Sequence, residues 1–120
     1  LGDINLFAVF SSENQISNIR PNFNLLEKLP GQGLIISSSG DKYDFVSRYF
    51  CPKFGINEDP VTGSAHTTLI PYWSYKLKKN SLHAKQISNR GGVLFCSNEE
   101  NRVLIGGNAV LYMKGEIEIS

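Results

Sequence analysis

SAHTTLIPYWSYKLKK, residues 64–79, is the longest run of this sequence with the periodicity of a helix, and the predicted fold is built around it. Its large apolar residues cover most of the helix surface, so we expect it to lie deep in the molecule, wrapped by strands. Pro71 falls within the run and should cost about 3 kcal/mol or bend the helix. The apolar residues that carry the periodicity are Leu69, Ile70, Tyr72, Trp73, Tyr75 and Leu77.

Segments typical of β-strands lie on both sides of this helix, because β-branched and aromatic residues cluster there between turn residues. A short second helix is predicted over 21–29, where Pro21 is well placed at the first turn. The segments 11–18 and 51–63 are predicted to have no regular structure. The predicted strands cover residues 4–10, 33–38, 43–50, 82–88, 93–97, 102–106, 108–113 and 115–120.

Helical segments between groups of strands, followed by a closing run of strand after strand, predict an α+β fold. We expect a single domain, residues 1–120, with a curled, mostly antiparallel β-sheet or barrel around one central helix. GEIEIS, residues 115–120, alternates strictly, which suits an edge strand or a strand that reaches a partner.

Composition and charge exclude several classes of function. The chain has 120 residues, 41% hydrophobic and 19% charged, which is typical of a globular domain. The net charge is +1 with scattered Lys and Arg, so we expect no nucleic-acid partner. The sequence has no bilayer-spanning apolar run and no signal peptide, so we expect no membrane partner and a cytoplasmic protein. The opening LGDINLFAVF lacks an initiator Met, which suggests a cut inside a longer protein or a processed end.

The two cysteines show no sign of a metal site. Cys51 and Cys96 lie far apart and lack the spacing of metal ligands. We therefore expect reduced, buried thiols and no metal.

DPVTGSAH, residues 59–66, leads into the predicted central helix and carries the chemistry. Pro60 favours an extended Asp59, which fixes where the carboxylate points. Gly63 allows the backbone to approach a ligand closely, and Ser64 opens the helix. The first turn of a helix has unpaired N–H groups and a partial positive charge, so it binds carboxylates or phosphates. This pattern suits a small substrate whose carboxylate is held by the helix while an acid faces it.

The same residues have an ordinary alternative. Ser and Thr before a helix are common caps worth about 1 kcal/mol, and Asp-Pro is a common turn. The spacing alone favours the cap. The sequence contains no Walker pattern, no GxGxxG and no Ser-His-Asp signature, which disfavours a phosphate-binding loop or a hydrolase.

Longer stretches resemble the C-terminal half of the PhzF-like family, named for phenazine biosynthesis. The resemblance covers nearly the whole chain and is most specific in EDPVTGSAH, residues 58–66. It continues through HAKQISNRGGVLF, residues 83–95, and RVLIGGNAVLYMKGEI, residues 102–117. The resemblance implies one half of a diaminopimelate-epimerase-like fold, in which two similar halves enclose the active site. The N-terminal half would be absent from this chain.

The resemblance also implies roles for single residues. Asp59 matches an acidic residue that helps hold or protonate the substrate. Gly63 and Ser64 match residues whose backbone and hydroxyl contact the substrate carboxylate. Thr62 and Ala65 would line the same wall of the site.

Three further residues each have a structural and a functional interpretation, and the structural one is favoured. His66 belongs to the motif but shares the apolar helix face, so a satisfied structural histidine is favoured over a ligand. Arg90, with Gly91-Gly92, matches a family turn, where a tight hairpin is favoured over a role near the cleft. Arg48 alternates with aromatic residues and suits an internal ion pair more than a substrate clamp.

The activity implied by the resemblance is isomerisation or epimerisation by proton transfer on a small carboxylate, without cofactor or metal. The family's main acid/base, a glutamate, and a histidine lie in the N-terminal half, so the fragment is expected to be inactive alone. Expected partners are a small carboxylate metabolite and the N-terminal half, with a homodimer as an open alternative. Neither cysteine lies in the motif, which disfavours the cysteine-pair chemistry of the diaminopimelate epimerases.

Two rival hypotheses remain. The chain could be a non-catalytic interaction module that keeps the fold and associates through its exposed cleft face, because dividing a two-half fold exposes an apolar wall. A proline-racemase-type half is a weaker alternative, since the cysteine or threonine pair which those enzymes need is missing from the motif.

Overall fold

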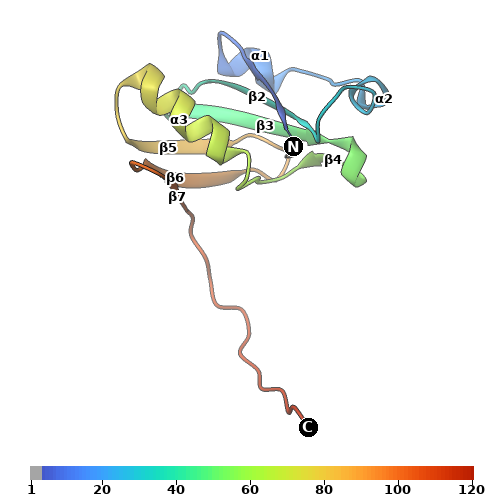
Figure 1. Cartoon of the computed structure of the whole chain (residues 1–120), viewed down its shortest axis with the longest axis vertical. Helices are drawn as coiled ribbons and strands as arrows, with labels where there is room; N and C mark the ends of the chain where they lie inside the picture. The colour runs from blue at the N-terminus through green and yellow to red at the C-terminus, as the bar shows by residue number, and fades with distance from the viewer. Residues whose placement is uncertain (1–3) are drawn as a thin grey trace.

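The computed structural model describes residues 4–120 and has an α+β fold with three α-helices and one seven-stranded sheet in that range (Figure 1). Residues 1–3, which belong to the opening without an initiator Met, lie outside the described part. The elements are β1 Leu6–Val9, α1 Glu13–Ser17, α2 Phe23–Leu26, β2 Leu34–Ser39, β3 Phe45–Cys51, the 3-10 turn η1 Pro52–Phe54, β4 Ile56–Asp59, α3 His66–Leu77, β5 Ser81–Gln86, β6 Gly92–Asn98 and β7 Val103–Gly106.

The sheet is mixed and open. Its strand order is β1-β2-β3-β5-β6-β7, with β4 paired to β3 outside this path. β1 pairs with β2 in parallel, as does β3 with β5, and the other neighbours are antiparallel. The prediction of a curled sheet or barrel around a helix was therefore wrong, because the sheet does not close around the helix. The two strands expected to complete it, 108–113 and 115–120, do not join the sheet.

Alternation along β2 and β3 divides the core between the two faces of the sheet, because successive side chains of a strand point to opposite sides. Ile35, Phe45 and Tyr49 pack with α3 in one cluster. Their neighbours in sequence, such as Ile36 and Val46, pack with α1 and α2 in a second cluster. Covered on both faces, β3 is buried along its entire length.

The helix predicted over 64–79 is confirmed as α3, but it is not wrapped by strands. Only one face of it packs on the sheet, through residues such as Leu69 and Trp73. Tyr75 is 86% exposed on the opposite side. Trp73 also donates from Nε1 to Ser37 Oγ at 2.9 Å, which fixes the helix across β2.

Three local predictions were incomplete. The segment 11–18, predicted as loop, contains α1, where Ser12 Oγ accepts from the Gln15 amide and Gln15 Oε1 accepts from the Ser11 amide. This exchange resembles a capping box, a signal that the sequence carried. The helix predicted over 21–29 is the shorter α2, and the segment 51–63 contains η1 and β4.

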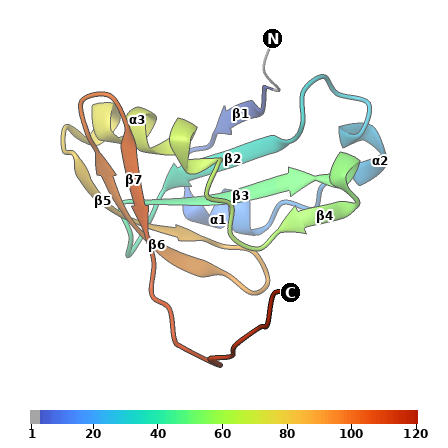
Figure 2. The same cartoon turned by 60° about the horizontal axis from the view of Figure 1, so that its bottom comes forward.

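The segment after β7 has no helix or strand and extends away from the sheet (Figure 1 and Figure 2). The strands predicted over 108–113 and 115–120 are therefore absent from the structure. Its large apolar side chains are all exposed: Val110, Leu111, Tyr112, Met113, Ile117 and Ile119. Within residues 4–120, no helix has the length and apolar character needed to span a bilayer.

Candidate functional site

The motif at 59–66 links the last residue of β4 to the first residue of α3. β4 pairs with the buried strand β3, and Asp59 lies opposite Tyr49 in that register. The Asp59 side chain is half-buried at this point. The sheet thus fixes where the chain leaves β4 and where the motif begins.

Arg48 anchors the start of the motif from the other face of the sheet. Its Nε and Nη2 donate to the two carboxylate oxygens of Glu58 at 2.8 and 3.0 Å. Its Nη1 donates to the carbonyls of Ile16 and Ile19 at 2.8 and 2.9 Å. The predicted internal ion pair is confirmed, and four of the five N–H donors of this guanidinium are bonded within the fold.

Thr62 has protein partners for its amide, carbonyl and hydroxyl. Its amide donates to Gln86 Oε1 at 2.7 Å, and its hydroxyl donates to Asp59 Oδ2 at 2.6 Å. Its carbonyl accepts from His66 Nδ1 at 2.7 Å. Thr62 is buried, so it lies behind the surface of the site.

The N-terminus of α3 presents unpaired donors. Among the described residues, the amides of Gly63, Ser64 and Ala65 have no acceptor, because the helical pairing begins with the His66 amide and the Gly63 carbonyl. No side chain caps the helix, so the interpretation of Thr62 and Ser64 as ordinary caps was wrong. Gly63 and Ser64 are exposed, and Ala65 is buried beneath them. Free amides at a helix N-terminus attract anions.

Gly63 is not required by the fold itself. A Cβ atom built at this position meets no atom within 4 Å, and its φ is not positive. The space on the Cβ side of Gly63 is therefore open, and the close approach of a ligand stays a prediction.

His66 is fully buried and neutral at neutral pH. Burial lowers the pKa of its imidazole, and the hydrogen bond to the Thr62 carbonyl opposes that shift only in part. Because a carbonyl only accepts, Nδ1 carries the proton and Nε2 is the unprotonated nitrogen. Nε2 has no partner within residues 4–120, and the ring lies beside Phe45 with centroids 5.9 Å apart. The burial and the bond to Thr62 agree with a structural histidine, but the unpartnered Nε2 shows that it is not the fully satisfied histidine that was predicted.

The turn around Arg90 packs against the motif. Ser88 Oγ donates to the Pro60 carbonyl at 2.7 Å and accepts from the Gly91 amide at 2.9 Å. A Cβ at Gly92 would approach Val61 Cγ2 to 2.3 Å, so only glycine allows this contact. The turn joins the antiparallel strands β5 and β6, as the hairpin interpretation predicted. Arg90 is exposed on this turn, and its role in binding stays a prediction.

Neither cysteine is suited to proton abstraction. Cys51 and Cys96 are both free and buried. Burial raises the pKa of Cys51, and nearby Asp59 raises it further. Burial, aided by Asp44, raises the pKa of Cys96 to about 11. Both groups are therefore protonated thiols at neutral pH.

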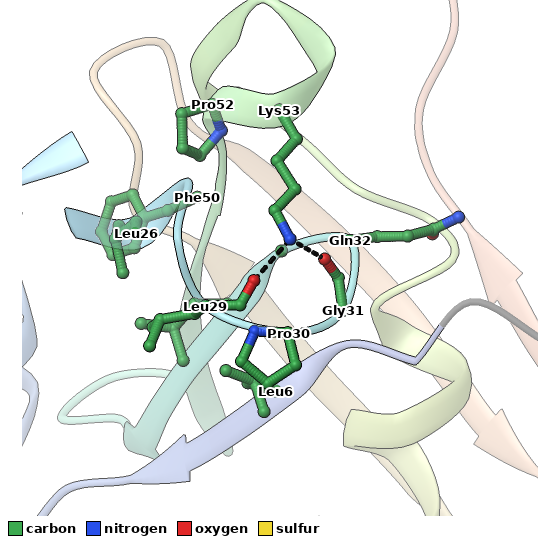
Figure 3. A pocket seen from close by; sticks show the side chains of 11 residues that line it. Leu6, Leu26, Leu29, Pro30, Gly31, Gln32, Phe50, Pro52 and Lys53 are labelled. Atoms are coloured by element: carbon green, nitrogen blue, oxygen red, sulfur yellow. Dashed lines mark hydrogen bonds between the residues drawn. The ribbon is translucent and has the colours of Figure 1, made fainter. Parts of the chain in front are cut away.

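A separate small pocket lies between α2 and η1 (Figure 3). Its volume of about 10 Å³ is close to that of one water. Lys53 Nζ donates there to the carbonyls of Leu29 and Gly31, so the one ammonium of this pocket is already bonded (Figure 3). This pocket is too small for a metabolite, and none of the residues at 59–66 line it.

Gln86 is the residue of the site that the sequence prediction missed. It occupies the inward face of β5 after Leu82 and Ala84, and its side chain is 1% exposed. A polar amide in an otherwise apolar inward stripe is the signal that could have identified it. Within residues 4–120, no three His, Cys, Asp or Glu side chains gather as metal ligands would.

Comparison with known proteins gives consistent matches. Residues 1–115 match the PhzC-PhzF family, described as phenazine biosynthesis-like protein. An uncharacterized isomerase of Pseudomonas aeruginosa is 50% identical over 96% of this chain and 44% of its own length.

Two solved structures have the same fold. A phenazine biosynthesis PhzC/PhzF protein from Clostridium difficile superposes with a TM-score of 0.86 at 50% identity, over 96% of this chain and 45% of that one. A PhzF-family protein from Enterococcus faecalis has the same TM-score at 52% identity, over 94% and 44%. The present chain thus spans less than half the length of the relatives it matches.

Proposed function

Because the chain belongs to the PhzC-PhzF, phenazine biosynthesis-like, family, we propose that it is the C-terminal half of a cofactor-independent isomerase. The complete enzyme moves a proton on a small carboxylate substrate, and this half is inactive without the rest. The naming of a 50%-identical relative as an isomerase supports this class of reaction. The observation that carries the proposal is the set of free amides at the start of α3, beside an Asp59 that is held in place.

Each group has a chemical role in this proposal. The exposed amides of Gly63 and Ser64 donate to the substrate carboxylate, where the helix N-terminus favours negative charge, and the Ala65 amide lies behind them. Asp59 orients the substrate or delivers a proton to it from one side. A base on the opposite side removes a proton from a carbon of the substrate, and returning a proton at another position or face gives an isomer. That second group belongs to the part of the relatives' length that this chain does not span.

The experiment follows proton exchange. The chain is joined to the segment that makes up the remaining length of its relatives, and a panel of small hydroxy and amino acids is incubated in D₂O. We expect deuterium to enter one substrate, and Asp59→Asn to reduce the rate at least about 100-fold, as removal of an acid–base group does. Exchange catalysed by the 120 residues alone, unchanged in Asp59→Asn, would contradict these roles.

A second candidate function, association without catalysis, is favoured by the exposed apolar side chains after β7. Val110 and Tyr112 are 94% and 97% exposed, so a partner that covers them would gain hydrophobic stabilisation. Light scattering separates the two proposals. A dimer in which Val110 and Tyr112 become buried favours association, whereas a monomer whose 63–65 amide NMR signals shift on adding acetate favours the half-site.

A further inference from the structure

Gln86 connects the sheet to the motif through three hydrogen bonds. Its Oε1 accepts from the Thr62 amide at 2.7 Å. Its Nε2 donates to the Asp59 carbonyl at 2.8 Å and to Thr62 Oγ1 at 3.0 Å. A glutamine amide has two hydrogens on nitrogen, so both are used. All three partners belong to a segment 24 to 27 residues away in sequence.

The hydroxyl of Thr62 passes this constraint to Asp59. Because the Gln86 Nε2 group can only donate, Thr62 Oγ1 must act as its acceptor. The single hydroxyl hydrogen is then free to point at Asp59 Oδ2, where the distance of 2.6 Å is that of a charge-assisted hydrogen bond. Gln86 therefore decides in which direction Thr62 donates, and Thr62 decides where the Asp59 carboxylate lies.

Gln86 also sets which amides of the loop stay free. Its Oε1 occupies the Thr62 amide, so the unpaired donors begin at Gly63. Without that acceptor, Thr62 would carry a buried, unsatisfied N–H and the loop could shift to pair it. The set of donors at the N-terminus of α3 depends in this way on one side chain of β5.

Packing by itself does not explain a glutamine at this position. The other inward residues of β5 are Leu82 and Ala84, and a buried amide is costly unless fully hydrogen-bonded. An apolar side chain of similar length would fill the same space but would leave the Thr62 amide and the Asp59 carbonyl without these partners. The amide is fully bonded only because the motif residues Asp59 and Thr62 lie opposite it.

We propose that Gln86 is a positioning residue of the isomerase site, which acts through Thr62 to hold the Asp59 carboxylate in one orientation. This inference rests on the proposed function and deepens it. Gln86 itself is buried and does not touch the substrate. Thr62 acts on Asp59 in the same way, as the intermediate in the contact.

The kinetic experiment uses the complete enzyme with three single variants. Gln86→Met keeps the length of the side chain, and Thr62→Val keeps its shape without the hydroxyl. We expect each to lower kcat about 10- to 100-fold with less than about a threefold change in KM, since a misplaced catalytic group costs rate more than binding. Thr62→Ser, which keeps the hydroxyl, should exceed Thr62→Val in kcat by at least about tenfold.

The double variant and a control distinguish positioning from stability. Gln86→Met combined with Thr62→Val should be no slower than the slower single variant, because both break one contact chain. Ser74→Ala removes another buried hydrogen-bonding side chain, whose Oγ lies 2.8 Å from the Lys79 carbonyl, and should leave kcat unchanged. Multiplicative losses in the double variant, or an unchanged kcat in Gln86→Met, would overturn the proposal.

A second measurement needs no substrate and separates this inference from the proposed function. Three-bond NMR couplings of the chain report the χ1 rotamer of Asp59. We expect one rotamer in the parent and Thr62→Ser, and averaging in Thr62→Val and Gln86→Met. Averaging without turnover of any carboxylate by the parent would leave the positioning intact and refute the isomerase. A single Asp59 rotamer in Thr62→Val overturns the positioning whatever the activity, and that variant suffices if Gln86→Met does not fold.

Discussion

The motif at 59–66 and the segment at 108–120 differ in how fully the fold specifies them. In and just before the motif, side chains that are distant in sequence hydrogen-bond to most of the polar groups. Arg48 bonds to Glu58, and Gln86 bonds to Thr62. Only a few donors at the start of α3 remain free. Among the described residues, the polar groups of the C-terminal segment have no such partners, and its two isoleucines are more than four-fifths exposed. The amides at the start of α3 are notable because the polar groups around them are hydrogen-bonded within the fold. A few unpaired donors among paired neighbours indicate a binding site better than solvent exposure does.

The largest expected effect comes from releasing the anchor of the motif. Arg48→Met should lower the free energy of unfolding by about 3 kcal/mol, because Glu58 is left without its partner and the buried Ile16 and half-buried Ile19 carbonyls lose a donor. Urea denaturation followed by circular dichroism measures it. Arg20→Met, at an exposed arginine, should change stability by less than about 0.5 kcal/mol. A loss of the same small size in Arg48→Met would mean that the motif does not depend on this anchor.

The next effect concerns ligand binding and compares Gly63, which has open space beside its Cα, with Gly92, which lies against Val61. Gly63→Ala should reduce acetate binding about tenfold, if the bound anion uses the open space that the added methyl would fill. Stability should change by less than about 0.5 kcal/mol, since that Cβ meets no other atom. NMR titration and thermal unfolding measure the two. Gly92→Ala, which forces Val61 to move, should show the reverse pattern.

A smaller effect is expected from pH. Burial lowers the pKa of His66 below the ordinary value of 6.5, so below that pH the unfolded chain binds a proton that the folded chain does not. Stability should therefore fall as pH decreases from 6.5 towards the lowered pKa, with a slope of at most about 1.4 kcal/mol per pH unit from this group.

His66→Asn provides the comparison for the pH series, because the Asn amide can still donate to the Thr62 carbonyl and does not titrate. Urea midpoints at several pH values should show a flatter slope in this variant between pH 5 and 6.5. An equal slope in both proteins would assign the pH dependence to other groups.

The smallest effect is expected in the C-terminal segment. Ile117→Ser combined with Ile119→Ser should change the free energy of unfolding by less than about 0.5 kcal/mol, because both side chains are exposed. Ile70→Ser, at a fully buried position, should cost at least about 3 kcal/mol. Thermal unfolding compares them. A marked loss in the tail variant would show that these residues are buried in solution by a partner or by another part of the chain.

Strands and the main helix were predictable wherever buried apolar residues recur at the spacing of a strand or a helix. β2, β3, β5, β6 and β7 and α3 all lie where the apolar pattern predicted them. The pattern failed at α1, where a capping exchange and one buried residue, Ile16, form a helix of five residues. It failed in the opposite direction over 108–120, where alternation indicates only that a segment could pair and not that an edge receives it.

The candidate site shows the same division. Sequence alone singled out Asp59 and the glycine and serine before α3, because Pro, Gly and a helix start constrain the backbone locally, and their roles in binding stay a prediction. It could not identify Gln86, because the bond to Thr62 spans 24 residues. It also favoured a helix cap that is absent, since the Thr62 hydroxyl donates to Asp59 instead.

The sequence by itself determined that a helix lies within residues 64–79, that strands precede and follow it in the chain, and that a segment suited to anion binding leads into it. These features follow from backbone preferences and side-chain periodicity, which act over a few residues. Only the tertiary structure decided that the sheet is open, that α3 covers one face, and which polar groups of the motif remain free. Those outcomes depend on residues that are far apart in the chain. Local sequence does not encode which distant acceptor pairs with a given donor in the folded protein.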